Sequence, residues 1–225
     1  MAKNDFSAES AENYEQKCLC VLVLDVSGSM SGKPIEELNK GLQDFYEEIS
    51  SDATTSQRLE VSLITFSHIV TTLQEPALVE NFTMPTLAAS GSTAMVNAVS
   101  HAIDKVAARK QWYKDTNQNY YRPWIILMTD GEPDSDQDVA ALAQRIKNDT
   151  QNKKYAFLPI GVEGANMKIL DQIKGNIPPM KLQGTKFGSF FKWLSASMGT
   201  IVSTGVGQAV DLTNGADDWM AAFTI

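Results

Sequence analysis

The sequence contains only two cysteines and two histidines among its 225 residues, which limits the metal and redox chemistry open to it. Cys18 and Cys20 are two positions apart on a predicted strand, where they share a face at a separation too long for a relaxed disulfide. We therefore expect two buried thiols. A zinc site would need two further ligands, and His68 and His101 lack the spacing of such a pair.

Positive charge and long apolar runs are also scarce. The formal net charge is −8 and the sequence pI is about 4.8, so the chain repels a phosphate backbone and nucleic acid is not an expected partner. No window approaches the roughly 18 to 20 consecutive apolar residues that span a bilayer. Residues 1–17 lack the apolar core of a signal peptide. We expect no membrane insertion and a cytoplasmic location.

Short apolar runs instead alternate with helical patterns. Residues 18–24, CLCVLVL, are typical of a central parallel strand that is covered on both faces. Residues 34–51 follow with apolar side chains at steps of three and four. This alternation predicts an α/β fold with a doubly wound, mostly parallel sheet and helices on both faces. The further predicted strands are residues 58–67, 68–74, 123–129, 155–162 and 180–184, and the further helices are residues 94–114, 138–148, 166–174 and 186–203.

Two of these segments allow more detailed predictions. Almost nothing separates residues 58–67 from residues 68–74, which predicts a sharp hairpin with the second run as an antiparallel edge strand. The last helix is crowded with large apolar side chains, and we expect that they cannot all face inward. These are Phe190, Phe191, Trp193 and Leu194.

Composition divides the chain into three parts. Residues 1–16 are polar and mixed in charge, and we expect a loosely ordered lead-in or a short surface arm. Residues 17–204 contain the alternating strands and helices and are expected to form one domain. Residues 205–225 have no clear periodicity, and we expect this tail to pack on the domain or to serve as a contact segment.

The stretch DVSGSM, which begins at Asp25, directly follows the first predicted strand. It presents a carboxylate and two alternate hydroxyls, those of Asp25, Ser27 and Ser29, within one turn. Hard oxygen groups of this kind are the ligands that a small divalent cation prefers. For this stretch alone, the simpler interpretation is a serine-rich turn in which Asp25 and Ser29 cap the following helix.

Two more oxygen-bearing residues are expected at the same place. Asp130 follows the strand at residues 123–129, and Thr93 precedes the helix at residues 94–114. Ligands of doubly wound sheets lie outside the carboxyl ends of the strands, where separate parts of the chain converge. A helix cap needs neither a distant threonine nor a distant aspartate, which favours a cation site. Its predicted residues are Asp25, Ser27, Ser29, Thr93 and Asp130, and its predicted ion is Mg²⁺ or Mn²⁺, with Ca²⁺ as an alternative.

These residues, in this order, resemble the metal-ion-dependent adhesion site of von Willebrand factor A domains. All five positions of that pattern are filled, and the predicted strands and helices from about residue 17 to 203 agree with the family's fold. The resemblance implies that Ser27, Ser29 and Thr93 contact the ion. It implies that Asp25 and Asp130 act directly or through water, and that a partner protein donates an Asp or Glu side chain to the open position.

Within that family, the compact size and the ending SFFKWLSASMGTIVS resemble the bacterial tellurium-resistance-associated proteins of the TerY type. This narrower resemblance implies a role in a bacterial stress response. It also implies that an operon-linked protein kinase or PP2C-type phosphatase is a candidate partner.

The predicted site lacks a nucleophile with an adjacent general base, so we expect a binding module and not an enzyme. The enzymatic alternative is a Mg²⁺-dependent phosphoryl hydrolase of the haloacid dehalogenase type, which requires a second aspartate where Ser27 stands. No phosphate-binding glycine loop is present. A scaffold that does not need metal is the remaining alternative.

We expect the residues beside the predicted site to have structural roles. We expect Ser92 to cap the helix that begins near Ala94. In the acidic loop after Asp130, we expect Asp134, Asp136 and Asp138 to form a solvated helix N-terminus, with Ser135 or Asp136 as the cap.

Overall fold

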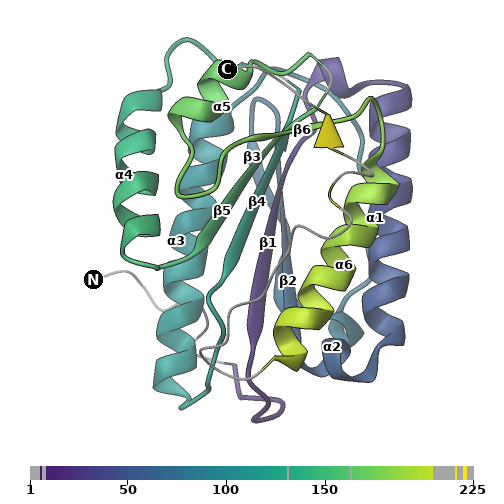
Figure 1. The fold of residues 1–225 in the computed structure, drawn as a ribbon, viewed down its shortest axis with the longest axis vertical. Coiled ribbons are helices and arrows are strands. Elements are labelled where there is room, and N and C mark those ends of the chain that lie inside the picture. Colours follow the sequence, from purple (N-terminus) through teal and green to yellow (C-terminus); the bar gives the residue numbers. More distant parts are fainter. Residues whose placement is uncertain are drawn as a thin grey trace.

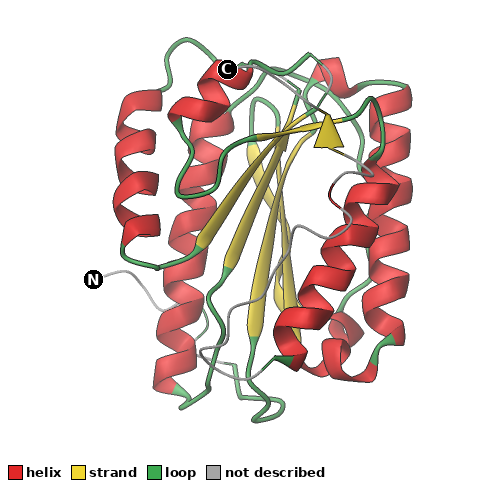
Figure 2. Ribbon diagram, in the orientation of Figure 1, coloured by secondary structure: helices red, strands yellow, loops and turns green. Residues whose placement is uncertain are grey.

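The structure is a computed structural model that describes Phe6, residues 9–130, 132–162 and 164–204, Ala216 and the backbone of residues 220–221. It contains one central sheet, labelled in Figure 1, and Figure 2 shows helices on both sides of it. The strands are β1 (Cys18–Asp25), β2 (Leu59–Phe66), β3 (Val70–Leu78), β4 (Trp124–Thr129), β5 (Ala156–Gly161), β6 (Met180–Leu182) and β7 (Met220–Ala221). The α-helices are α1 (Lys33–Ser51), α2 (Ala53–Arg58), α3 (Met95–Asp115), α4 (Val139–Gln151), α5 (Met167–Gln172) and α6 (Phe187–Ser203).

The sheet has the strand order β3-β2-β1-β4-β5-β6-β7. Strands β2, β1, β4, β5 and β6 are parallel, and β3 is antiparallel at one edge. This confirms the predicted doubly wound, mostly parallel sheet with its antiparallel edge strand. The two-residue strand β7 pairs antiparallel with β6, an addition that the sequence pattern did not predict. Leu24 of β1 lies opposite Met128 of β4, so the carboxyl ends of these two strands are neighbours.

The side chains of β1 pack into two separate parts of the core, one on each side of the sheet. Leu19, Val21 and Val23 pack with buried side chains of α3, α4 and α5. The alternate residues, such as Leu22 and Leu24, pack with α1 and α6. Because successive strand residues point to opposite faces, an unbroken apolar run is required here, which is why CLCVLVL has no polar alternation. The described residues contain no helix that is long and apolar enough to cross a membrane.

Cys18 and Cys20 lie inside this core with no exposed surface, and both are free thiols. The predicted buried thiols are therefore confirmed. Burial raises the pKa of the Cys18 thiol to about 12 and the pKa of Cys20 well above its usual value. Both cysteines stay protonated at neutral pH and act as small apolar side chains.

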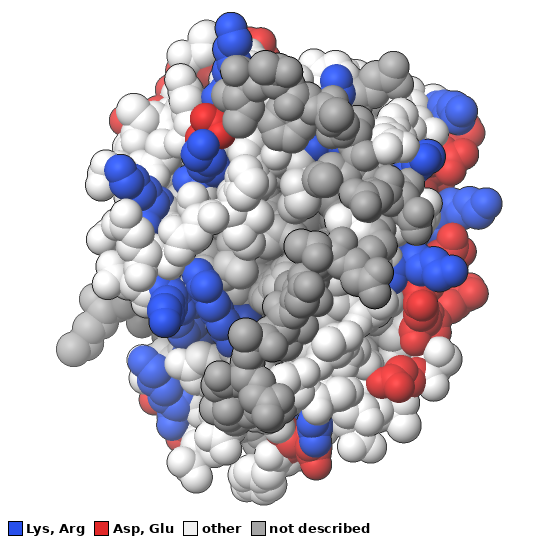
Figure 3. All heavy atoms as spheres, in the orientation of Figure 1, with Lys and Arg blue, Asp and Glu red and all other residues white. Residues whose placement is uncertain are grey.

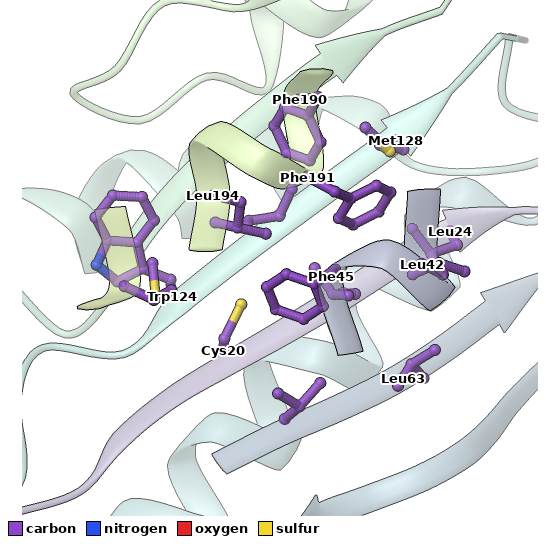
Figure 4. Packing of buried hydrophobic residues seen from close by; sticks show 14 of the residues in the cluster. Cys20, Leu24, Leu42, Phe45, Leu63, Trp124, Met128, Phe190, Phe191 and Leu194 are labelled. Carbon is purple, nitrogen blue, oxygen red and sulfur yellow. The ribbon is translucent and has the colours of Figure 1, made fainter. Parts of the chain in front are cut away.

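The aromatic run of α6 is buried more completely than predicted. Phe190, Phe191 and Leu194 have no exposed surface, and Trp193 is 8% exposed, so the expectation that some of these side chains face outward was wrong. The reason is that α6 packs against α1 and the sheet together, as Figure 4 shows. The ring centroids of Phe191 and Phe45 of α1 are 5.6 Å apart, and those of Phe190 and Trp193 are 5.8 Å apart.

The contact between α1 and α6 depends on Gly41. A Cβ atom at this position would lie 2.8 Å from Cδ2 of Phe191 and 3.1 Å from the backbone carbonyl carbon of Phe187. Gly41→Ala is expected to lower the free energy of unfolding by about 1–3 kcal/mol, because the two helices must move apart. Urea unfolding measures this change.

Gly199→Ala in α6 is the matched control. Its added Cβ would lie 3.6 Å from Oγ1 of Thr55, an ordinary contact. Alanine has a higher helix propensity than glycine, so this variant should be as stable as the wild type or more stable by up to about 1 kcal/mol. Equal stability of the two variants would show that Gly41 does not set the helix spacing.

A buried ion pair joins the start of β2 to α3. The guanidinium of Arg109 donates two hydrogen bonds of 2.8 Å to the carboxylate of Glu60, and both side chains are nearly fully buried. Tyr113 donates its hydroxyl to Glu60 at 2.5 Å, and the Arg109 guanidinium lies 3.9 Å from the ring centroid of Trp112. Burial alone would lower the pKa of Arg109, but the bonds to Glu60 outweigh it and raise that pKa.

The described part of the N-terminal segment packs onto this pair. Glu9 accepts a hydrogen bond of 2.5 Å from Arg109, and its backbone carbonyl accepts the indole N–H of Trp112 at 3.3 Å. Phe6 is buried against Trp112 and Tyr113. These contacts attach the segment to α3. In the C-terminal segment, Ala216 packs against the core on the α6 side, and β7 extends the sheet. The other residues of the predicted tail lie outside the described residues.

Candidate metal centre

Asp25 is the last residue of β1, and its carboxylate has no exposed surface. One carboxylate oxygen, Oδ1, accepts the backbone N–H of Ser27 at 2.8 Å. The other, Oδ2, accepts the hydroxyl of Thr129, the last residue of β4, at 2.6 Å. These two bonds fix the carboxylate at the point where the first strand becomes a turn.

The hydroxyls of Ser27 and Ser29 lie beside Asp130. A short 3₁₀ turn over Gly28–Met30 brings the two Oγ atoms within 3.0 Å of each other. The Ser29 hydroxyl donates to Oδ1 of Asp130 at 2.8 Å, although the two residues are 101 positions apart. The structure therefore brings Asp130 to the DVSGSM turn, as the strand order requires. Gly131, the next residue of the motif, lies outside the described residues.

The loop that carries Thr93 lies against the same turn. The backbone N–H of Gly28 donates to the carbonyl of Gly91 at 2.9 Å, and that of Ser90 donates to the carbonyl of Val26 at 2.7 Å. Gly91 has a φ of +84°, and a Cβ there would lie 2.4 Å from Nδ1 of His68. The positive φ favours glycine at this position, and an added Cβ would also displace the exposed His68 ring. The loop thus carries Thr93, which is 8% exposed, to the edge of the site.

Asp134 and Gln137 hold the backbone of Thr93, and the sequence interpretation gave neither residue this role. Oδ1 of Asp134 accepts the Thr93 N–H at 3.3 Å, and Oδ2 accepts the Ser92 hydroxyl at 3.0 Å. The side-chain amide of Gln137 donates to the Thr93 carbonyl at 2.8 Å, and its Oε1 accepts the N–H of Val96 at 2.6 Å.

Three predictions about these neighbours were wrong. Ser92 does not cap α3, because its hydroxyl donates to Asp134 while Gln137 accepts an N–H group at the start of that helix. Asp134 is not simply solvated, because it accepts hydrogen bonds from the loop before α3. The cap of α4 is Asp138, which accepts the N–H of Ala141 at 2.9 Å, and not Ser135 or Asp136.

No cationic side chain among the described residues pairs with the two carboxylates of the site. Burial raises the pKa of Asp25, while its bonds from Ser27 and Thr129 act in the opposite direction and the nearby Asp130 raises it further. Burial also raises the pKa of Asp130. Within the described ranges, neither carboxylate takes part in an ion pair with lysine, arginine or histidine. A bound cation would compensate this buried negative charge.

The donor atoms fit a small hard cation. Adjacent ligands of an octahedral Mg²⁺, each about 2.1 Å from the ion, lie about 3 Å apart. The oxygens of Ser27, Ser29 and Asp130 are separated by 3.0 and 2.8 Å. Among the residues that the structure describes, no group of three or more histidine, cysteine, aspartate and glutamate side chains could hold a metal ion. A cation at this place therefore depends on hydroxyl oxygens.

Comparison with known families agrees with the fold described above. A family model described as the von Willebrand factor type A domain matches residues 20–187. The chain belongs to this family. The matched range begins in β1 of this VWA domain and ends at the start of α6, so it contains all five predicted site residues. No curated protein matches the sequence.

Several solved structures share the fold of this VWA domain. The vWF domain of the type V pili tip protein Mfa5 from Porphyromonas gingivalis is 11% identical, with a TM-score of 0.61 over 87% of this chain and 99% of that one. The open conformation of the pilus adhesin SpaC from Lactobacillus rhamnosus GG is 15% identical, with a TM-score of 0.64 over 84% of this chain and 31% of the SpaC chain. The ArnB paralog VWA2 from Sulfolobus acidocaldarius is 16% identical, with a TM-score of 0.57 over 82% of this chain and 46% of the VWA2 chain. The chain thus spans less than half of the last two structures, and the likeness establishes the fold alone.

Proposed function

We propose that this VWA domain is a metal-dependent protein-binding module, in which a Mg²⁺ ion at the DVSGSM turn captures an acidic side chain of a partner. VWA domains commonly mediate protein–protein interactions, and two of the similar structures belong to pilus proteins. The observation that carries the proposal is the line of oxygens from Ser27 through Ser29 to Asp130, next to the uncompensated carboxylate of Asp25. Mn²⁺ and Ca²⁺ are alternative ions.

Each residue has a separate task in this proposal. The hydroxyls of Ser27, Ser29 and Thr93 would hold the ion as neutral ligands. Asp25 and Asp130 would balance its charge, directly or through water, and Asp25 orients the turn by accepting the N–H of Ser27. The bound ion would supply an electrophilic position for a carboxylate from another protein. Thr129, Asp134 and Gln137 position these groups through the hydrogen bonds described above.

We propose that the protein is not an enzyme. A phosphoryl hydrolase of the haloacid dehalogenase type needs an acid–base aspartate two residues after the first one, and here that position is Ser27, whose hydroxyl lies against Ser29. Turnover of a generic aryl phosphate in Mg²⁺ by the wild type, and its loss in Asp25→Ala, would contradict this proposal. The proposed protein-binding function has a narrower form, which rests on the sequence resemblance. In this form the protein acts in a bacterial tellurium-resistance stress response, and its partner is an operon-linked kinase or PP2C-type phosphatase.

Ser29→Ala is expected to weaken Mg²⁺ binding by about ten- to a hundredfold, because it removes one hydroxyl ligand and the bond that holds Asp130. Isothermal titration calorimetry with MgCl₂ measures this change. Ser31→Ala is the matched control, because Ser31 is exposed and lies two residues further along the chain. Equal affinities in the two variants would show that Ser29 is not a ligand.

The protein-binding part of the proposal needs a separate test. Immobilised peptides that contain a single aspartate or glutamate should capture the wild type in Mg²⁺ and release it in EDTA. Ser29→Ala should be captured weakly in either condition. Capture that is the same in Mg²⁺ and EDTA would instead support a scaffold that does not need metal.

A further inference from the structure

A cleft between α3 and α4 lies away from the metal centre and is lined by cations. Its volume is about 360 Å³, at the lower end of the range for small-molecule sites. The floor is apolar and includes Ile103, Val106 and Ala107 of α3, while Lys110 and Lys114 continue the same helix face toward the C-terminal end of α3. Figure 3 shows lysine and arginine side chains gathered at the lower left of the view, near the point where α4 leads into β5.

The cations on the α4 side of this cleft pair with carboxylates, whereas, among the described residues, the lysines at the C-terminal end of α3 do not. At the α4 side, Arg145 pairs with Asp104 at 2.5 Å and Lys154 pairs with Asp149 at 2.7 Å. At the other end, Lys110 donates to the backbone carbonyl of Lys154 at 2.9 Å, and its ammonium nitrogen lies 5.8 Å from the centroid of the Tyr120 ring. Within the described part of the chain, neither Lys110 nor Lys114 takes part in an ion pair with a carboxylate.

Arg122 adds a further cation beside this end. Its guanidinium donates to the backbone carbonyls of Thr150 and Tyr155, at 3.2 and 2.5 Å, so its charge is not neutralised by these bonds. Burial lowers the pKa of Lys110, and the nearby charges of Lys114, Lys154 and Arg122 lower it further, with Asp149 opposing them. Neighbouring cations repel one another, and a bound anion would relieve this repulsion.

We propose that this cleft binds a phosphate monoester, with the phosphate between Lys110 and Lys114 and an apolar or aromatic organic part on the floor formed by α3. A phosphate dianion matches two lysine ammonium groups in charge and accepts their hydrogen bonds. The apolar floor distinguishes this site from one for a free inorganic anion, because only an ester brings a group that buries it. This proposal does not depend on metal binding at the DVSGSM turn.

Calorimetric titration with 2-naphthyl phosphate, in a buffer without phosphate, tests the proposal. We expect 2-naphthyl phosphate to bind at least tenfold more tightly than inorganic phosphate. Lys114→Ala should weaken it about tenfold, and because Lys114 is exposed this change should not affect folding. Lys40→Ala on α1, also exposed, is the control and should bind like the wild type.

Three results would overturn the proposal. One is equal affinity for 2-naphthyl phosphate and inorganic phosphate, which would mean that the floor is not used. Another is equal affinity of wild type and Lys114→Ala. The third is tighter binding of a glutamate-rich peptide than of 2-naphthyl phosphate, which would assign the cleft to an acidic partner protein. Measuring each titration again in EDTA separates this site from the metal centre.

Discussion

Arg109→Ala is expected to lower the free energy of unfolding by about 3–5 kcal/mol, the largest loss we predict for a single substitution. The guanidinium of Arg109 makes both hydrogen bonds to the buried carboxylate of Glu60 and a third bond to Glu9. Its removal leaves the Glu60 charge buried with only the Tyr113 hydroxyl as a partner from this network. Urea or guanidinium unfolding, with the linear extrapolation to water, measures the change.

Arg145→Ala is the control, because Arg145 pairs with Asp104 at 2.5 Å and both of these side chains are substantially exposed. Arg145 also lies 4.0 Å from the buried carboxylate of Asp149, but that carboxylate keeps Lys154 as a partner at 2.7 Å. Exposed ion pairs contribute about 0–1 kcal/mol, so this variant should differ little from the wild type. A second test replaces the pair by apolar residues, as Arg109→Met with Glu60→Leu. This double variant should be much more stable than Arg109→Ala. Similar losses in Arg109→Ala and Arg145→Ala would show that burial of the Glu60 pair is not what matters.

Asp25→Asn is expected to make the metal-free protein more stable by about 1 kcal/mol or more and to abolish its response to Mg²⁺. The asparagine side chain keeps the size of aspartate and can still accept the Ser27 N–H, and the Thr129 hydroxyl can turn to accept from its amide. The substitution removes a buried charge that has no cationic side-chain partner among the described residues. In our proposal, a bound cation compensates this charge in the wild type. A change of 1 kcal/mol corresponds to a melting-temperature shift of about 2–4 °C for a chain of this size.

Thermal unfolding in EDTA and in excess Mg²⁺ measures both parts of this prediction. Asp44→Asn is the control, since Asp44 is exposed on α1 and distant in sequence from the site. It should leave stability in EDTA unchanged and keep the full response to Mg²⁺. If Asp25→Asn were less stable than the wild type in EDTA, the carboxylate would stabilise the metal-free protein. That result would contradict the claim that its charge is unfavourable without a bound ion.

The position of the candidate site could be predicted because it follows from strand order. Once β1 and β4 are parallel neighbours, Asp25 and Asp130 must lie at the same edge of the sheet. The hydrogen bond of Ser29 to Asp130 across 101 positions is a consequence of that order. Local patterns were sufficient here, since the continuous apolar runs of residues 18–24 and 123–129 identify both strands.

Contacts made by single polar side chains of loops could not be predicted in the same way. Asp134 and Gln137 lie in an acidic stretch that looks like a solvated helix start, and nothing local shows that they hold the backbone of Thr93. The pairing of Glu60 with Arg109 spans 49 positions and joins a strand to a helix. The prediction that some aromatic side chains of α6 face outward was wrong for a related reason. Helical periodicity cannot show that a helix has neighbours on two sides.

The most direct test of the metal centre is the melting temperature of the wild type and Asp25→Ala during titration with MgCl₂, from EDTA to a hundredfold excess over the dissociation constant. An ion that binds only the folded state stabilises it by about 2.7 kcal/mol at that excess, which corresponds to a rise of about 5–10 °C. We predict this rise in the wild type and none in Asp25→Ala. An equal rise in both proteins would place the ion elsewhere, and no rise in either with Mg²⁺, Mn²⁺ or Ca²⁺ would contradict a cation site at the DVSGSM turn.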